Sequence, residues 1–326
     1  MESVDRPDGA AARVSIPLDG RLERSSLPPL LTAILALLVA FLLFQVVVSP
    51  LVLLLVLGAQ GISPMELLNN MEQILENESR ALLIANTAGQ VLAIGLPALL
   101  LARGHSSAPL AFLRMRRIDG TAFILALVGL AALIPITQWV GTLNEMLPLP
   151  EWVRAMEAAQ HRLLERTLMD EANLVFNLLV LAVTPAVCEE LLFRGYVQRQ
   201  AERSLGFAGG IVFSGVVFGL YHLRLTQIVP LTLVGLYLAY LTWHFRSIWP
   251  AVVAHFVFNG FAVVLGAVVS REGGLNVEDI DKMDVPWYLL VGCVVILGIV
   301  VRIMRRRTPA GAVVHEVDPY ERRATE

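Results

Sequence analysis

Long apolar stretches alternate with shorter polar ones along almost the whole chain. Each apolar stretch has about 20 residues, the length that an α-helix needs to cross the hydrocarbon core of a bilayer. We expect eight membrane-spanning helices, at residues 30–57, 81–101, 121–143, 172–188, 207–223, 227–245, 248–270 and 286–304. Pro50 should kink or end the first of them. The pattern therefore predicts an all-α, polytopic integral membrane helix bundle with about eight transmembrane helices.

The polar stretches divide the chain into six parts. Residues 144–171 combine Trp152, Met156 and several leucines with acids and arginines, which predicts an amphipathic extracytoplasmic helix or, equally well, a solvated connector. The parts are a flexible cytoplasmic tail at 1–29, transmembrane helices 1–3 at 30–143, the amphipathic segment at 144–171, a core of helices 4–7 at 172–270, an external loop with helix 8 at 271–304, and a cytoplasmic tail at 305–326.

Composition and charge agree with a membrane protein. Hydrophobic residues make up 56% of the chain and charged residues only 16%, which excludes an ordinary soluble domain. Most of the 25 lysines and arginines lie in the two tails and in the loops expected on the same side. This bias predicts a multi-pass protein of the cell membrane with both termini cytoplasmic and lipids as partners. No basic stripe with interleaved aromatic residues is present, so we expect no nucleic acid partner.

Three charged residues, Glu189, Glu190 and Arg194, directly follow the fourth apolar stretch. A charge at the centre of a membrane helix costs roughly 2.5–3.5 kcal/mol, so such a group needs partners or a function. Glu190 and Arg194 are four residues apart and should pair on one helix face. Glu189 points about 100° away from Glu190 and stays available for chemistry. We expect this stretch at the cytoplasmic end of the fourth helix.

Polar residues also occur inside two later apolar stretches. His222 ends the fifth, one turn after Phe218, and His255 and Asn259 share one face of the seventh. A single histidine in a membrane helix is often only a packing residue that forms a hydrogen bond. Together with Glu189, however, the two histidines come from three helices that can converge, and ionisable groups inside a membrane usually mark a functional site.

Other polar residues and glycines have simpler interpretations. Cys188 and Cys293 cannot form a disulfide framework, and the acids beside Cys188 make a catalytic thiol unfavourable. We expect Gly215 and Gly219 to allow close helix packing. Interhelical hydrogen bonds are expected from Asn86, Thr87, Gln90 and Gln138. Solvated side chains are expected for His105, His161 and His315.

The polar residues of the core follow three spacings: Glu189-Glu190-x-x-x-Arg194, Phe218-x-x-x-His222 and His255-x-x-x-Asn259. They resemble the signature motifs of the CPBP family of intramembrane proteases, which includes the type II CAAX prenyl endopeptidases and the bacteriocin-immunity (Abi) proteins. The resemblance covers about residues 175–265. It implies an endopeptidase that cleaves a peptide or protein substrate near the cytoplasmic face, with a lipidated CAAX-like C-terminus as one substrate class.

Chemistry and resemblance together suggest a role for each residue. Glu189 is the expected general base, and His222 would help to hold or activate the water. His255 and Asn259 could donate hydrogen bonds to the oxyanion. Glu190 and Arg194 would fix Glu189 or orient the substrate, and Arg194 could also receive a substrate carboxylate.

Alternative interpretations remain open from the sequence. Two histidines and a glutamate are also a common set of zinc ligands. The sequence is therefore as compatible with a metalloprotease as with a glutamate-dependent protease, although no HExxH motif occurs. We favour water activation by Glu189 without an obligatory metal. A non-catalytic scaffold or immunity protein could retain the motifs for packing. A proton-coupled transporter that uses Glu189 and Glu190 as a relay should show repeated halves, which we do not find.

Overall fold

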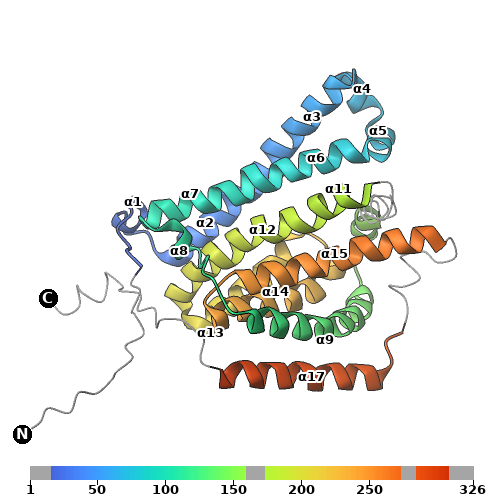
Figure 1. Cartoon of the computed structure of the whole chain (residues 1–326). Coiled ribbons are helices and arrows are strands. Elements are labelled where there is room, and N and C mark those ends of the chain that lie inside the picture. The colour runs from blue at the N-terminus through green and yellow to red at the C-terminus, as the bar shows by residue number, and fades with distance from the viewer. Residues whose placement is uncertain (1–15, 159–172, 273–283, 308–326) are drawn as a thin grey trace, which may run out of the picture.

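The computed structural model describes residues 16–158, 173–272 and 284–307 (Figure 1). Within these ranges the secondary structure is helical and contains no strand. The first half comprises α1 (Arg21–Arg24), α2 (Pro29–Leu42), η1 (Leu43–Val48), α3 (Ser49–Ala59), α4 (Pro64–Asn69), α5 (Met71–Asn77), α6 (Ser79–Gly89), η2 (Gln90–Gly95), α7 (Leu96–His105), α8 (Pro109–Phe112) and α9 (Gly120–Glu145). The second comprises α11 (Leu174–Leu178), η4 (Leu179–Val183), α12 (Thr184–Glu190), η5 (Leu191–Val197), α13 (Gln198–Tyr221), η6 (Leu225–Gln227), α14 (Ile228–Phe245), α15 (Trp249–Glu272) and α17 (Trp287–Arg306).

Prolines inside the long helices are accommodated by wide helical turns. Pro50, Pro97 and Pro185 each follow a π-helical segment, namely η1, η2 and η4. A proline has no N–H to donate to the preceding turn, and a local change to longer-range hydrogen bonds absorbs the loss. The chain therefore stays helical through Pro50, and the first apolar stretch forms one 31-residue helical unit, Pro29–Ala59.

The chain reverses direction at Gly206, which has a φ of 72° that favours glycine. Contacts across the reversal run antiparallel: Ser214 Oγ donates to the carbonyl of Phe193, and the ring of Phe193 packs on that of Phe218. The expected end of the fourth helix at residue 188 is therefore wrong, because helix continues to Gly206. The charged stretch lies inside this helix, roughly 24 Å from the reversal, and not at its end.

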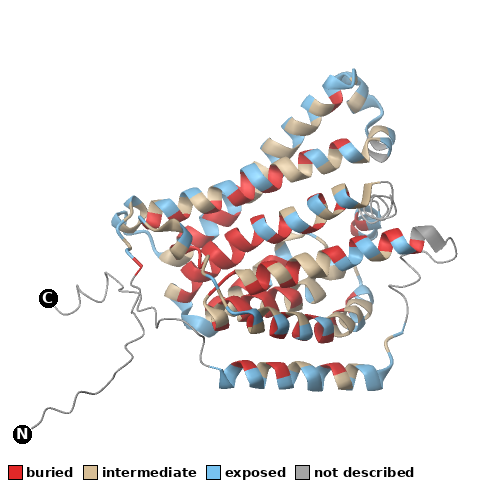
Figure 2. Ribbon diagram, in the orientation of Figure 1, coloured by how far each residue is buried: buried red, intermediate tan, exposed pale blue. Residues whose placement is uncertain are grey.

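Seven helical units are long and apolar enough to cross a membrane among the described residues. One of them, Leu174–Tyr221, has 48 residues and folds back at Gly206. It therefore supplies two antiparallel helices of the bundle, residues 174–205 and 207–221; each long helix of the bundle is called a leg below. Large apolar residues such as Leu38, Leu55, Leu100 and Ile124 are exposed. Exposed positions recur along the outer helices of the bundle (Figure 2). Such an outer surface suits lipid, and it confirms the predicted polytopic helix bundle of about eight helices.

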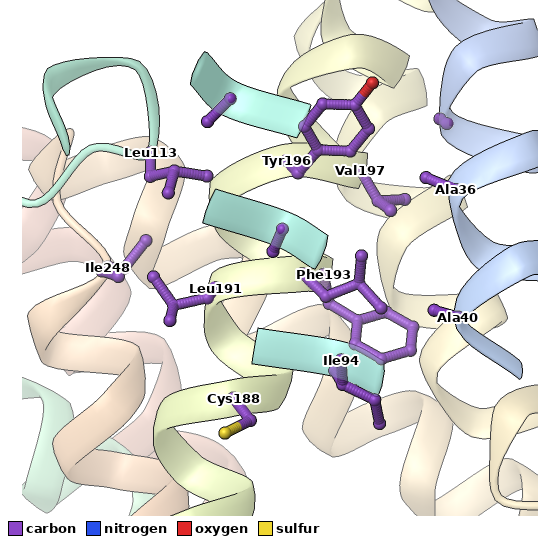
Figure 3. Packing of buried hydrophobic residues seen from close by; sticks show 14 of the residues in the cluster. Ala36, Ala40, Ile94, Leu113, Cys188, Leu191, Phe193, Tyr196, Val197 and Ile248 are labelled. Atoms are coloured by element: carbon purple, nitrogen blue, oxygen red, sulfur yellow. The ribbon is translucent and has the colours of Figure 1, made fainter. Parts of the chain in front are cut away.

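The interior is built by close helix packing around the leg that contains α12 and η5. Side chains of this leg, including Phe193, Tyr196 and Val197, are fully buried against alanines of α2 and against Ile94 of η2 (Figure 3). Small residues make this contact close. Between α13 and α14 the predicted role of Gly215 is confirmed, since a Cβ there would lie 2.8 Å from the backbone nitrogen of Leu236. Close packing of this kind holds membrane helices together where lipid removes the hydrophobic drive.

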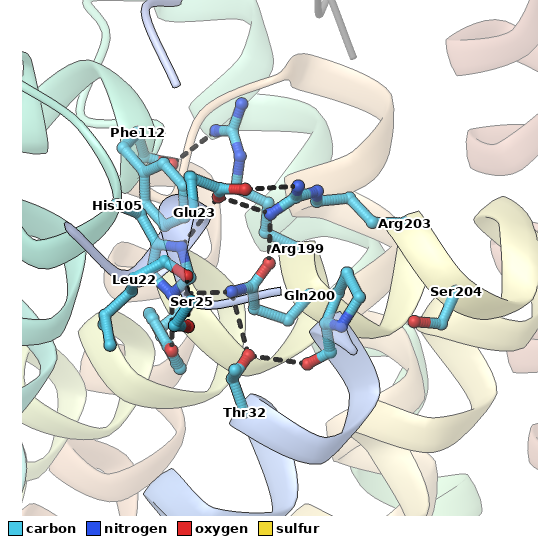
Figure 4. Close-up of polar contacts among 12 residues, drawn as sticks. Leu22, Glu23, Ser25, Thr32, His105, Phe112, Arg199, Gln200, Arg203 and Ser204 are labelled. Atoms are coloured by element: carbon cyan, nitrogen blue, oxygen red, sulfur yellow. Dashed lines mark hydrogen bonds and ion pairs between the residues drawn. The ribbon is translucent and has the colours of Figure 1, made fainter. Parts of the chain in front are cut away.

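The end of the N-terminal tail is packed, contrary to the expectation of a flexible segment throughout 1–29. Glu23 of α1 accepts hydrogen bonds from His105 Nδ1 at 2.7 Å and from Arg203 (Figure 4). His105 Nε2 contacts the Tyr196 hydroxyl. His105 is 2% exposed, so the expectation that it is solvated was also wrong. Residues 16–28 thus join the bundle, whereas the tail before residue 16, His161 and His315 lie outside the described residues.

The described part of the predicted amphipathic segment, residues 144–158, contains the end of α9, a short connection and a helix at residues 151–158. It exposes Trp152 and Met156 and buries Val153 and Glu157. The carboxylate of Glu157 accepts hydrogen bonds from the backbone nitrogens of Leu225 and Thr226. This helix therefore caps the loop that follows His222.

Candidate active site

The ion pair predicted from the spacing of Glu190 and Arg194 is present and fully enclosed. Arg194 Nη1 donates to Glu190 Oε1 at 2.9 Å, and both side chains are 0% exposed. His255 of α15 donates from Nδ1 to the same oxygen, also at 2.9 Å. One carboxylate oxygen thus joins two helices through two charge-assisted contacts.

Arg194 also contacts α13 and α14. Its Nη2 donates to the carbonyl of Gly235 in α14 at 3.0 Å, and its guanidinium lies 4.3 Å from the centroid of the Phe218 ring. A desolvated cation over an aromatic face adds about 2 kcal/mol of attraction. Because both Nη groups are engaged and the side chain is sealed off, the placement does not suit reception of a substrate carboxylate.

Phe218 stands at the centre of the predicted constellation. Its buried ring makes edge contacts with both histidines, at centroid distances of 4.8 Å to His222 and 5.6 Å to His255. The structure thus brings the three sequence motifs together around one aromatic side chain. The ring and the cation above it restrict how either imidazole can turn.

Glu189 is 8% exposed and uses its two oxygens differently. Oε1 accepts a hydrogen bond from Gln90 Nε2 at 2.9 Å. Oε2 is buried and has no hydrogen-bond partner among the described residues, and it lies 4.0 Å from His222 Nε2. A separation beyond hydrogen-bond range between two polar groups is the geometry that a bridging water uses.

The backbone fixes the protonation pattern of His222. This residue caps the end of α13, and its Nδ1 lies 2.8 Å from the carbonyl of Phe218. A carbonyl can only accept, so Nδ1 carries the proton and Nε2 is left to accept a hydrogen bond in the neutral ring. The side chain is 30% exposed, more than those of Glu189, Glu190, Arg194 and His255.

Asn259 occupies the position one turn along α15 from His255. Its Nδ2 donates to the carbonyl of Leu181 in η4 at 3.1 Å. That carbonyl belongs to the π-helical segment that precedes Pro185. Asn259 therefore connects α15 to the leg of Glu189 and Glu190.

An apolar cleft of about 200 Å³ lies between α12 and α15, beside the buried network. Its lining consists of the side chains Val183, Ala186, Val187, Val252, Val253 and Phe256. Val187 precedes Glu189 by two residues, and Val252 precedes His255 by three. The cleft thus offers space for an apolar group next to the polar site.

The donor set does not match a zinc site in this arrangement. Zinc needs three or four ligands at about 2 Å from one point. Within 16–158, 173–272 and 284–307, no three His, Cys, Asp or Glu side chains gather in that way. Nδ1 of His255 is directed to Glu190 instead of to Glu189 and His222.

Gln90 was missed as part of the site. The sequence indicated only a generic interhelical hydrogen bond, and the structure places its amide on the expected general base. The available signal was weak: a single long amide in an otherwise apolar span. Its partner cannot be inferred without the packing of two helices about 100 residues apart in the chain.

The fold and the site define a class of protein: a polytopic helical membrane protein with a carboxylate–histidine centre inside its bundle. Residues 171–261 match the family profile described as "Type II CAAX prenyl endopeptidase Rce1-like". The chain is also 26% identical over 88 residues to a Bacillus subtilis protein named "Putative membrane peptidase YdiL". These matches confirm the resemblance to the CPBP family of intramembrane proteases over the helices that carry the site.

The matches cover part of each protein. The Bacillus subtilis alignment takes in 27% of this chain and 36% of that relative's length, so the chain spans about a third of it. No solved structure matches the chain. The N-terminal legs, which include Gln90, lie outside the matched segment.

Proposed function

We propose that the protein is an intramembrane endopeptidase whose hydrolytic water is activated by Glu189. The observation that carries this proposal is the buried Glu189 Oε2, which has no hydrogen-bond partner among the described residues and lies 4.0 Å from His222 Nε2. A buried carboxylate with one free oxygen beside an imidazole is suited to take a proton. The match to a peptidase family supports the peptide bond as the target.

Glu189 Oε2 and His222 Nε2 are both hydrogen-bond acceptors when the His222 ring is neutral. A water placed between Glu189 Oε2 and His222 Nε2 donates one hydrogen to each, which leaves its lone pairs free for attack on a carbonyl carbon. Glu189 takes one proton as the C–O bond forms. The same proton then passes to the leaving amine nitrogen as the C–N bond breaks, so the base is regenerated.

The attack turns the substrate carbonyl oxygen into an oxyanion, which needs hydrogen-bond donors to stabilise it. We assign this role to His255 and Asn259. Because His255 Nδ1 already donates to Glu190, the ring donates from Nε2 to the oxyanion only when both of its nitrogens carry a proton. Glu190 and Arg194 act in this proposal as the frame that holds His255 and Phe218.

The surroundings favour a substrate that is partly apolar. The cleft between α12 and α15 would receive an apolar side chain or lipid group next to the scissile bond. A CAAX-like lipidated peptide fits these requirements, as does another membrane-associated peptide. We place the cleavage on the cytoplasmic side of the bilayer, in line with the distribution of lysines and arginines.

The test compares new protein termini in membranes from cells that carry the native chain and from cells that carry Glu189→Gln. We expect termini that appear only with the native chain, and a fall of about 10²–10⁴-fold in their rate of appearance for the variant. Cys188→Ala, one residue away, is the matched control and should cleave like the native chain. Equal termini for the native chain and for folded Glu189→Gln would point to the non-catalytic scaffold instead.

The proposed step needs no metal. A chelator such as EDTA, applied to the purified protein, should leave cleavage unchanged. Loss of cleavage with the chelator and recovery with added zinc would contradict this part of the proposal and favour a metalloprotease. Glu189→Gln would still be inactive in that case, so the two questions separate.

A further inference from the structure

The second membrane unit, Ser79–His105, contributes a polar side chain to the site. Gln90 is 7% exposed, and its Nε2 donates to Glu189 Oε1 at 2.9 Å. This hydrogen bond makes the two oxygens of Glu189 different, since Oε2 has no such partner in the described chain.

The local backbone explains how Gln90 reaches this place. It begins the π-helical turn η2, which the following Pro97 causes by withholding a backbone donor. A π-turn inserts one extra residue and so changes the face to which neighbouring side chains point. Gly95, at the end of the same turn, allows close approach, because a Cβ there would lie 3.0 Å from Cys188 Sγ.

The chemistry of the contact has a direction. The amide N–H of Gln90 donates and Glu189 Oε1 accepts, which is the direction that an ionised carboxylate, the form required of a general base, can use. It also fixes the carboxylate plane, so that Oε2 faces His222. The carbonyl oxygen Oε1 of Gln90 is itself buried without a partner in the described chain and could not replace the amide nitrogen next to a carboxylate.

We propose that Gln90 is a positioning residue for the general base: it holds Glu189 Oε1 so that Oε2 is presented to the water and to His222. This inference rests on the proposed function. It extends the site beyond the matched segment 171–261 to a helix that carries none of the three motifs.

The first test uses kinetics on a peptide that spans a cleavage site found in the comparison of termini. Gln90→Met keeps the side-chain length and removes the donor, and we expect kcat to fall about 10–100-fold with KM nearly unchanged. Gln90→Asn keeps the amide but is one methylene too short, so it should lose a similar factor. Thr87→Val is the control, because the Thr87 hydroxyl donates to the carbonyl of Leu83 in its own helix.

The second test is spectroscopic and does not depend on proteolysis. The infrared difference between the native chain and Glu189→Gln contains the carboxylate bands of Glu189. With Gln90→Met as the background, these bands should shift, whereas they should stay in place with Thr87→Val. Thermal melting of each purified variant shows that it is folded.

The outcomes distinguish the two proposals. Shifted bands together with lower kcat support the positioning role of Gln90. Unshifted bands, or native kcat in both Gln90 variants while Glu189→Gln is inactive, overturn the inference and leave the peptidase proposal standing. Native membranes that yield no new termini relative to Glu189→Gln overturn the peptidase proposal and the positioning role with it.

Discussion

At the scale of single residues, burial decides which charges can do chemistry. Glu190 and Arg194 are 0% exposed and bonded to each other, and His255 and Gly235 extend the network. Each of the two glutamates keeps one oxygen without a hydrogen-bond partner among the described residues, and the one of Glu189 lies 4.0 Å from His222 Nε2. Two adjacent carboxylates therefore have separate uses, one in holding the helices and one in the proposed catalysis.

Removal of the buried cation should be severe. Arg194→Met leaves Glu190 without its main partner, and breaking a buried ion pair typically costs about 3–5 kcal/mol. We expect a loss of this order in the free energy of unfolding, measured by reversible denaturation in mixed detergent. Arg80→Ala is the control: its partner Asn173 is reached at the exposed surface, so the change should stay within about 0.5 kcal/mol. A native-like Arg194→Met would show that the network is not a structural frame.

Some of this could be predicted from the sequence and some could not. The Glu190–Arg194 pair follows from helical spacing alone, and the convergence of Glu189 with His222 from the order of the motifs. The contacts of Glu190 with His255 and of Glu189 with Gln90 depend on how helices distant in the chain pack. His105 was misjudged because its segment looks polar, although its partners Glu23 and Tyr196 enclose it.

At the scale of elements, the turn after His222 is held by helices that carry none of the motifs. Asn144, near the end of α9, donates to the carbonyl of Leu225 at 2.7 Å and accepts from the backbone nitrogen of Val229. Glu157 bonds the nitrogens of Leu225 and Thr226. The position of His222 thus depends on the cap formed by residues 151–158, whose polar sequence did not indicate that role.

Loss of the cap should loosen this turn. Glu157→Ala leaves two backbone N–H groups without an acceptor, which costs about 1–3 kcal/mol for buried groups. We expect faster hydrogen exchange in peptides that cover residues 223–227 and a lower rate of cleavage. Glu151→Ala, an exposed position in the same helix, should change neither. Unchanged exchange in folded Glu157→Ala would mean that the turn is fixed by other contacts.

At the scale of the whole molecule, the N-terminal segment ties together the ends of several helices. Glu23 contacts α7 through His105 and α13 through Arg203, and Asp19 accepts from the backbone nitrogen of Ser107. Burial alone would raise the pKa of Glu23, but hydrogen bonds from His105 and Arg203 and the charge of Arg203 outweigh it and lower the pKa from 4.5 to about 2. This contact is therefore stronger for the ionised carboxylate.

The lowered pKa sets a direction for pH dependence. The stabilisation is complete above about pH 4.5, the ordinary pKa, and is lost as pH falls towards 2. We expect up to about 3 kcal/mol of docking free energy to disappear over that range. Hydrogen exchange of residues 16–28, corrected for intrinsic rates, should rise on acidification. Glu23→Gln should raise exchange already at neutral pH and remove the dependence, while exposed Glu66→Gln should behave like the native chain. Flat exchange in the native chain from pH 5 to 2.5 would contradict this prediction.

The helix from Leu174 to Gly206 has a further consequence for biosynthesis. It carries Glu189, Glu190 and Arg194 far from either end, and each costs roughly 2.5–3.5 kcal/mol to insert alone. Glu190 and Arg194 can pair within this helix, and Gln90, the partner of Glu189, is synthesised earlier. The carbonyl of Gly235 and the ring of His255, however, are synthesised later. The buried network is therefore completed only after the chain has been made beyond residue 255, and we expect the helix to be less stable in the bilayer until then.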